Sequence, residues 1–206
     1  MNAQDCLNML RQIRDVAFAT VGEDGWPKNR IIDVMLSEHE KLYFCTATGK
    51  DFYQELIKDG RVAITGLNQQ WQMVRLTGVA TKLEEQKYWI DRIFAENPSM
   101  NDVYPGESRY ALEPFCIERG EAEFFDLGKS PIERASFVIG GASVQGKGFM
   151  ITESCIGCGI CARVCPQQCI TVGKPSSIAQ QHCLHCGRCA QHCPNGSIVR
   201  REHHAT

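Results

Sequence analysis

The same cysteine pattern occurs twice in the last quarter of the chain, and this repeat constrains the fold more than any other feature. The run "CIGCGICARVCP" has cysteines at positions 155, 158, 161 and 165, followed by Pro166. The run "CLHCGRCAQHCP" repeats the spacing at 183, 186, 189 and 193, followed by Pro194. A segment this short cannot bury a large apolar core, so it needs a chemical staple, which the cysteines can supply.

The spacing C-x2-C-x2-C-x3-C-P is typical of cysteines that bind 4Fe–4S clusters. Three thiolates of each run surround one cluster, whereas the fourth follows a turn of helix and reaches the neighbouring cluster. We therefore expect two clusters with crossed ligands. Cluster I is assigned Cys155, Cys158, Cys161 and Cys193, and cluster II is assigned Cys165, Cys183, Cys186 and Cys189.

Zinc is the alternative occupant, because two C-x2-C pairs can form a zinc ribbon. A zinc site uses four ligands, however, and has no use for the third regularly spaced cysteine and the Cys-Pro pair in both runs. The ninth cysteine of the region, Cys169, lies outside both runs and is expected to be a small buried hydrophobic residue. His182, His185 and His192 lie between the ligand cysteines in the sequence. Because the eight cysteines already supply every cluster ligand, we expect these histidines at the surface or beside the clusters.

Residues 149–200 resemble the bacterial two-cluster ferredoxins at all eight ligand positions. The clusters would pass electrons to or from a redox partner protein or a small-molecule acceptor. The twelve cysteines and the lack of a signal-peptide pattern at the start indicate metal binding in a reducing compartment, so we expect a cytoplasmic protein. The net charge of −2 gives no indication of a nucleic-acid or membrane partner.

The earlier part of the chain mixes many strand patterns with a few helical ones. Helical spacing is found at 4–14, 51–60 and 84–97. Strand patterns are found at 15–21, 28–36, 41–48, 61–67 and 71–83. We expect a loop at 98–112 and a hairpin or bent strand pair at 113–127. Consecutive strands joined by short turns favour an antiparallel sheet or barrel. Residues 128–148 are expected to be a linker, with room for one further strand.

Neither a G-x-G-x-x-G run nor a Walker A run is present, so a Rossmann or P-loop nucleotide site is not expected. The stretches "FATVGEDGWPKNRIID", "LYFCTATGKDFYQELIKDGRVAITG" and "WQMVRLTGVATKL" resemble the FMN-binding split barrel of the pyridoxamine 5'-phosphate oxidase-like superfamily. The resemblance implies FMN in a cleft at a homodimer interface. Heme and deazaflavin binders share this barrel, so the kind of cofactor stays open.

A flavin phosphate needs cationic and N–H partners. The resemblance aligns Arg30 and Lys50 with phosphate-contacting positions, and Lys50 precedes an expected helix whose N-terminal N–H groups favour an anion. Side-chain hydroxyls and a glycine beside Lys50 suit the same phosphate, and three further residues are expected at the isoalloxazine ring. The expected flavin contacts are Arg30, Ile31, Ile32, Thr46, Thr48, Gly49, Lys50 and Gln72.

The expected fold class is α+β: an antiparallel split β-barrel over 1–127, a linker over 128–148 and a two-cluster ferredoxin domain over 149–206. Flavin exchanges one or two electrons, so the chain is expected to be a flavo-iron–sulfur oxidoreductase. The alternative is an electron carrier or redox-sensing module without a substrate of its own. Steady-state turnover distinguishes the two, and no catalytic acid or base stands out in the sequence.

Overall fold

The computed structural model describes residues 1–142 and 146–201, which divide into two compact units. The first unit comprises Met1–Gln69, Met73–Glu123 and the described residues from Ser136 to 142. The second comprises Gln70–Gln72, Phe124–Ala135 and the described residues from 146 on. The ends of three long strands therefore belong to the second unit, which is larger than the ferredoxin-like segment alone.

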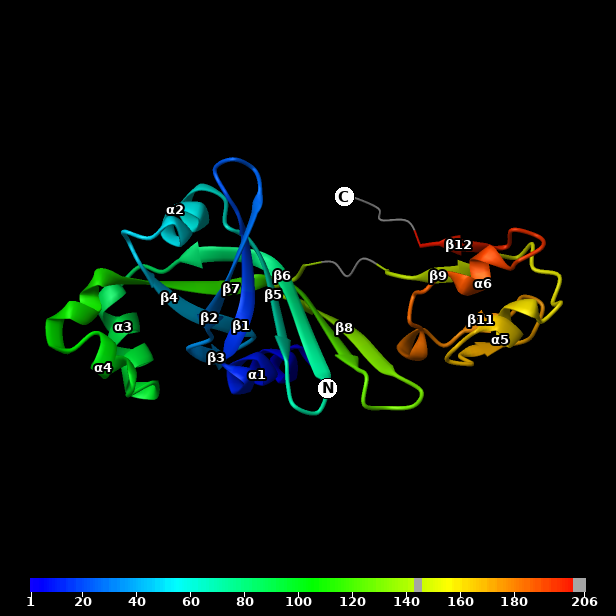
Figure 1. Cartoon of the computed structure of the whole chain (residues 1–206), viewed down its shortest axis with the longest axis horizontal. Helices are drawn as coiled ribbons and strands as arrows, with labels where there is room; N and C mark the ends of the chain where they lie inside the picture. Colours follow the sequence, from blue (N-terminus) through cyan, green and yellow to red (C-terminus); the bar gives the residue numbers. More distant parts are fainter. Residues whose placement is uncertain (143–145, 202–206) are drawn as a thin grey trace. The chain divides into compact units, whose positions relative to one another are not determined.

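The first unit is a curled antiparallel sheet with a few helices (Figure 1). The strands follow the order β2-β1-β5-β6-β7-β4-β3, and β8 pairs with β7. This arrangement confirms the predicted fold class. In chain order the elements are α1 Ala3–Ile13, β1 Asp15–Val21, β2 Pro27–Asp33, β3 Leu36–Glu38, β4 Lys41–Ala47, α2 Asp51–Lys58, β5 Arg61–Leu67, β6 Gln72–Lys82, α3 Gln86–Glu96, α4 Met100–Val103, a 3-10 turn Gly106–Ala111, β7 Leu112–Asp126 and β8 Glu133–Ile139.

The inside of the curled sheet is filled by aromatic rings. Phe18 of β1, Phe44 of β4 and Phe115 of β7 are fully buried, and the Phe18 and Phe44 ring centroids lie 4.8 Å apart. Phe52 of α2 adds a fourth ring, 5.3 Å from Phe18. Figure 1 shows α2 above the strands of the curled sheet and α1 below them. The apolar packing thus fixes the start of α2, next to the expected phosphate position.

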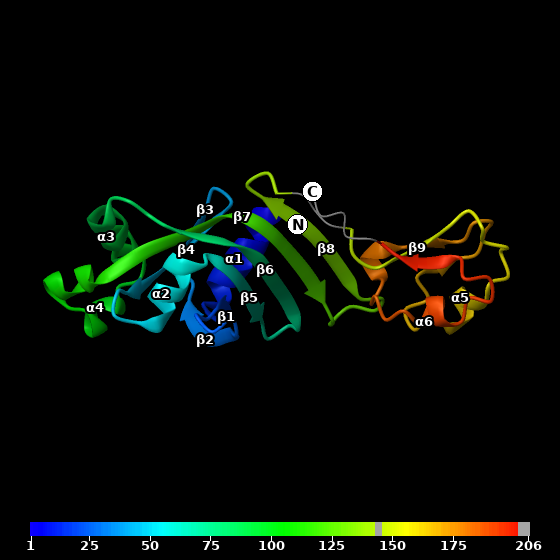
Figure 2. The ribbon, with the colours of Figure 1, turned by 90° about the horizontal axis from the view of Figure 1, so that it is seen from above.

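One strand replaces the hairpin that we expected at 113–127. β7 runs unbroken from Leu112 to Asp126 beside β6 and β8 (Figure 2). Gly120, within this strand, lies where two strands approach closely: a Cβ there would be 2.2 Å from the Thr77 carbonyl oxygen. Glycine is therefore needed at position 120 because the neighbouring strand is close, and not because the chain reverses direction there.

Two other segments also differ from the expected pattern. The segment 98–112 contains α4 and the 3-10 turn where we expected a loop, because Tyr104 and Met100 pack on the cluster of buried side chains that α3 builds against β4. The segment 128–148 contains β8, the further strand for which the sequence left room. None of the helices in 1–142 and 146–201 combines the length and hydropathy that a bilayer-spanning segment requires.

The second unit carries both cysteine runs on short elements. Two two-stranded pairs and two helices make up its ordered frame: β9 Phe149–Ile151 pairs with β12 Ile198–Arg200, β10 Ile170–Thr171 pairs with β11 Ser177–Ile178, and α5 Ile160–Val164 and α6 Arg188–Gln191 pack against each other. Its buried cluster consists of four cysteines and two isoleucines, Cys161, Cys169, Cys183, Cys189, Ile170 and Ile198. A core of this composition buries little hydrocarbon, so the unit needs another source of stability.

Candidate functional site

The eight cysteines of the two runs line two separate hollows in the second unit, four in each. One hollow is lined by Cys155, Cys158, Cys161 and Cys193. The other is lined by Cys165, Cys183, Cys186 and Cys189. Each encloses about 330 Å³ between protein atoms, its open mouth included. The fourth cysteine of each run therefore lies with the first three of the other run, which is the crossed grouping that the spacing predicts.

The repeat in the sequence produces a repeat in backbone conformation. Gly159 and Gly187 occupy equivalent positions, and each caps its helix, α5 or α6, with a left-handed φ of 72° and 75°. Glycine adopts this conformation without the steric cost of a side chain. Gly157 has φ 72°, and its counterpart in the second run is His185, with φ 56°. The left-handed turns direct successive cysteines toward one hollow, as wrapping a compact cluster requires.

Backbone N–H groups donate to the thiol of the first cysteine of each run. Backbone N–H groups of Ser176 and Gly157 lower the pKa of the Cys155 thiol. The N–H of His185 donates to Cys183 Sγ at 3.4 Å. Burial instead raises the pKa of Cys161 and Cys189, so these thiols need a bound metal to lose their protons. Donors of this kind fit a cluster, whose thiolates and sulfides accept hydrogen bonds.

The zinc alternative requires four thiolates close to one ion. Four thiolates around one zinc ion lie about 3.8 Å from one another, given a Zn–S distance of about 2.3 Å. In the parts of the chain that the structure describes, no group of three or more His, Cys, Asp or Glu side chains is close enough to hold a single metal ion. The chemistry and spacing of the cysteines suit a cubane.

Cys169 is a fifth thiol in the second hollow. It is buried, and its sulfur lies 3.6 Å from Cys165 Sγ. Burial, followed by the neighbouring Cys165, raises the pKa of Cys169 to about 12, so it remains a protonated thiol at neutral pH. The burial of Cys169 agrees with the expected role of a small buried hydrophobic residue. Its position in the lining of the second hollow was not predicted.

Two of the histidines contact backbone carbonyls and not the hollows. His182 Nδ1 lies 2.8 Å from the Ile132 carbonyl oxygen, and His192 Nδ1 lies 2.9 Å from the Arg188 carbonyl oxygen. Neither histidine lines either hollow. They hold loops around the cysteines, as expected for residues beside the clusters.

In the first unit, Arg30 of β2 is held by a buried network that the sequence did not reveal. Its guanidinium donates to Thr20 Oγ1 and, at 2.7 Å, to Glu55 Oε2. Its Cζ also lies 4.6 Å from the Phe52 ring centroid. The signal for this network was Glu55 itself: it follows Phe52 by three residues on the buried face of α2, where a carboxylate requires a partner. Arg30 thus braces α2 and shares its charge with Glu55.

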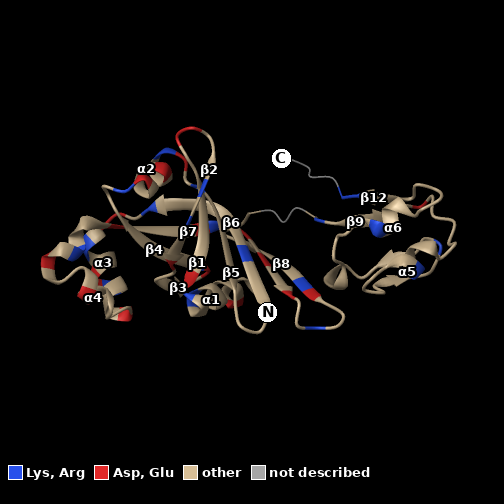
Figure 3. Cartoon of the chain, viewed as in Figure 1, with Lys and Arg blue, Asp and Glu red and all other residues tan. Residues whose placement is uncertain are grey.

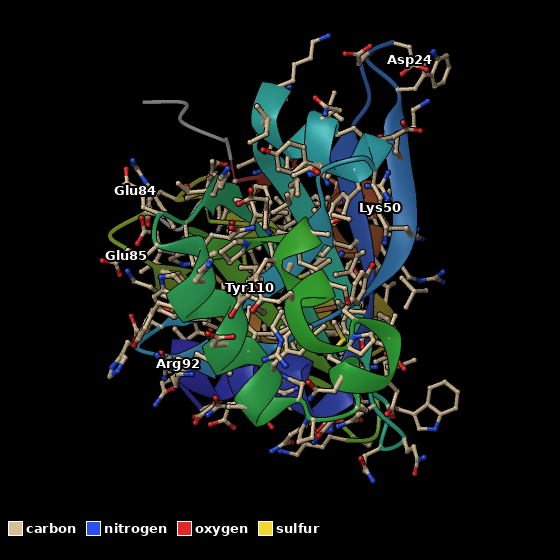
Figure 4. All side chains as sticks on the ribbon, turned by 90° about the vertical axis from the view of Figure 1, so that its left-hand side faces the viewer. Asp24, Lys50, Glu84, Glu85, Arg92 and Tyr110 are labelled. Atoms are coloured by element: carbon tan, nitrogen blue, oxygen red, sulfur yellow. The ribbon has the colours of Figure 1, made fainter. Side chains whose placement is uncertain are left out.

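The start of α2 carries the residues that best fit a phosphate group. Thr46 is buried, and its hydroxyl has no hydrogen-bond partner among the described residues. Thr48, Gly49 and Lys50 follow as an exposed turn, and Lys50 directly precedes the first residue of α2 (Figure 4). An unpaired buried hydroxyl, a lysine and free helical N–H groups together match what a phosphate dianion accepts.

A cleft rich in charged groups lies beside α2. This cleft of about 400 Å³ is lined by Glu23, Asp24, Lys28, Asp51, Gln54 and Glu55. Figure 4 shows Asp24 at the tip of the β1–β2 hairpin, away from Lys50. Three of its four carboxylates are ion-paired, Asp24 with Lys28, Glu55 with Arg30 and Glu23 with Lys58. The unpaired hydroxyl of Thr46 lies outside the lining of this cleft.

The three residues expected at the flavin ring are not all grouped with the phosphate residues. Ile31 is 64% exposed and points to the face of β2 opposite Arg30, whereas Ile32 shares the Arg30 face. Gln72 belongs to the second unit, where its amide donates to Asp126 Oδ2 at 3.0 Å. Thr46, Thr48, Gly49 and Lys50 form the stretch that leads into α2, whereas Arg30 contacts Phe52 and Glu55 within that helix.

Replacing Thr46 by valine tests the unpaired hydroxyl. Burying an unsatisfied polar group costs about 1–3 kcal/mol, so Thr46→Val should raise the melting temperature of the flavin-free protein. The same change should weaken flavin binding about tenfold, because a hydrogen bond to a charged phosphate is lost. Calorimetry and fluorescence titration measure the two effects. Thr77→Val, at an exposed strand position, is the matched control, and a stability loss in Thr46→Val would show that its hydroxyl is already satisfied.

Comparison with known proteins agrees with both units. The family described as pyridoxamine 5'-phosphate oxidase matches residues 4–109, and the 4Fe-4S dicluster domain family matches residues 154–197. The second match confirms the prediction of two 4Fe–4S clusters, and FMN is the cofactor that the resemblance to the first family implies. No curated protein matches the chain.

Solved structures resemble the barrel. A NimC/NimA family protein from Clostridium acetobutylicum has a TM-score of 0.57 and 19% identity, covering 67% of this chain and 92% of that one. A Clostridium acetobutylicum protein related to general stress protein 26 of B. subtilis (pyridoxinephosphate oxidase family) has a TM-score of 0.51 and 15% identity, covering 66% and 96%. Identities this low show the fold alone. The family match spans half of the chain, and the chain therefore belongs to the pyridoxamine 5'-phosphate oxidase family, with a 4Fe–4S dicluster domain after its barrel.

Proposed function

We propose that the protein is a flavo-iron–sulfur oxidoreductase that passes electrons between FMN in the barrel and two 4Fe–4S clusters in the second unit. The observation that carries the proposal is the grouping of eight cysteines into two hollows, in a chain whose barrel belongs to a flavin-associated family. A dicluster domain carries electrons one at a time, and it needs a group that donates or accepts them.

Each group would be held by residues already described. Cluster I would take Cys155, Cys158, Cys161 and Cys193, and cluster II would take Cys165, Cys183, Cys186 and Cys189. Lys50 and Thr46 would bind the FMN phosphate beside the N-terminus of α2, with Arg30 bracing that helix from β2. Bound FMN supplies the exchange between two-electron and one-electron chemistry.

The protein is proposed to act as a homodimer in the cytoplasm. Ile31 leaves 64% of its surface exposed on β2, where a second copy could cover it. The twelve cysteines, all within the described residues, form no disulfide, as in a reducing compartment. The dicluster domain also implies an electron-transfer partner, for which we propose a redox protein or a small-molecule acceptor.

Anaerobic purification followed by cofactor release tests the proposal directly. About eight irons, eight sulfides and one FMN per chain are expected. The flavin is then reduced selectively by light with an external donor, and the cluster absorbance is followed in time. Bleaching of the clusters after the flavin, at a rate independent of protein concentration, indicates transfer within the protein.

Steady-state turnover separates the proposed enzyme from an electron carrier or redox sensor. An enzyme oxidises NADH or NADPH, or reduces a small acceptor, over many cycles, whereas a carrier only equilibrates with its partner. Zinc in place of iron in oxygen-free protein would contradict the proposal outright. If the protein contained iron but no bound flavin, the proposed electron transfer would be restricted to the clusters of the second unit.

A further inference from the structure

The loop between β7 and β8 is hydrogen-bonded to the segments that carry two ligands of cluster II. All the residues concerned belong to the second unit, which includes Phe124–Ala135. Arg134 Nη1 donates to the Cys183 carbonyl oxygen at 3.0 Å. The Ile132 N–H donates to Gln167 Oε1 at 3.0 Å, and the Ile132 carbonyl oxygen lies 2.8 Å from His182 Nδ1. His182 directly precedes Cys183, and Gln167 follows Cys165 by two residues.

Among these contacts, Arg134 alone brings a full charge to a cluster ligand. It lies at the start of β8, where Figure 3 shows an acidic and a basic position side by side. The Phe125 ring centroid lies 5.5 Å from its Cζ, so the guanidinium is held on both sides, by a ring and by a carbonyl. Arginine remains protonated at every physiological pH. The charge is therefore permanent and fixed in position beside Cys183.

A fixed positive charge near a cluster favours its reduction. Reduction adds one negative charge to the cluster, and a nearby cation lowers the free energy of the reduced state through Coulomb attraction. Reduction potentials of 4Fe–4S clusters depend on local charge, hydrogen bonds and exposure. The carbonyl carbon of Cys183 is three bonds from Cys183 Sγ, so the guanidinium is hydrogen-bonded to the ligand residue itself.

We propose that Arg134, at the start of β8, raises the reduction potential of cluster II. The proposal rests on the ligand assignment under Proposed function and goes beyond it, because it gives residues 124–135 a part in electron transfer. Sequence spacing assigned most of these residues to a linker. The contacts make them a part of the cluster environment.

Redox titration of the full-length Arg134→Gln protein tests this role. The potential of one cluster should fall, with about a fivefold smaller equilibrium constant for reduction, which equals about 40 mV for one electron at 59 mV per decade. Paramagnetically shifted β-protons of the ligand cysteines report each cluster separately, and those of Cys183 and Cys186 should move with the lowered potential. Arg134→Lys keeps the charge and should recover most of the change.

Lys129→Gln is the matched control, since it removes one positive charge from the loop that precedes Arg134. Lys129 pairs with Glu133 and does not line either hollow. It should leave both potentials unchanged. Unchanged potentials in Arg134→Gln, with full iron content, would overturn the proposal, and so would equal shifts of both clusters. An iron content far from eight in the unmodified protein would instead contradict the ligand assignment, so the two failures are distinguishable.

Discussion

The double variant Cys165→Ala/Cys186→Ala is expected to keep about four irons per chain, whereas Cys165→Ala/Cys158→Ala is expected to lose nearly all of them. In the crossed assignment, Cys165 and Cys186 serve the same cluster, so removing both costs one cluster only. Cys158 serves the other cluster, and the second pair of changes damages both. Iron and sulfide quantitation on anaerobically purified protein measures the difference.

The uncrossed assignment makes the opposite prediction, since each run would then hold its own cluster. Retention of four irons by Cys165→Ala/Cys158→Ala would contradict our grouping. Cys169→Ala is the matched control: this thiol is buried in the second hollow but is not assigned as a ligand. It should retain about eight irons and lose only the small packing contribution of one buried thiol.

The single variant Cys158→Ala should also reduce the stability of the whole second unit. Its buried cluster contains four cysteines and two isoleucines, so metal binding supplies much of the folding free energy. We expect residues 149–201 to become susceptible to proteases while the barrel stays resistant. Mass spectrometry of limited digests measures this, and equal resistance of both units would contradict it.

The second large effect is expected at the start of α2. Lys50→Ala should weaken FMN binding by about 10- to 100-fold, because a charge-assisted hydrogen bond to a phosphate contributes about 1.5–3 kcal/mol. Iron content should not change, since Lys50 lies in the first unit. Fluorescence titration of the flavin-free protein measures the dissociation constant.

Lys58→Ala is the matched control for Lys50→Ala, because Lys58 is the last residue of the same helix and pairs with Glu23. It should leave the FMN dissociation constant within about twofold. Equal weakening by both changes would mean that only the net charge of α2 matters. Loss of iron together with flavin in Lys50→Ala would contradict the division into two cofactor modules.

The cysteine grouping was predictable from sequence because it follows from local spacing. Cys161 and Cys165 lie on and just after one short helix, so the turn of that helix decides which hollow each thiol faces. The ion pair of Arg30 with Glu55 was not predictable in the same way. Its partners lie 25 residues apart and meet only when β2 and α2 close over the Phe52 ring. Sequence indicated the charge of Arg30 but not what balances it.

The strands were predicted where alternating burial marks them, as at β1 and β5. The expected hairpin or bent strand pair at 113–127 was wrong, because β7 continues through Gly120 where the neighbouring strand approaches closely. Nothing in the local sequence of Gln72 indicated its hydrogen bond to Asp126.

The close approach of β6 and β7 limits how this protein can change over evolution. A Cβ at Gly78 would lie 2.5 Å from the Arg119 carbonyl oxygen, and a Cβ at Gly120 would lie 2.9 Å from the Gly78 Cα. The two obstructions are backbone atoms, which cannot rotate aside as a flexible side chain can. Replacing either glycine alone would cause a collision with backbone atoms. Replacing both would still cause collisions with the carbonyl oxygens of Arg119 and Thr77. These two mid-strand positions thus require glycine, although β-branched residues are favoured at most other positions inside strands.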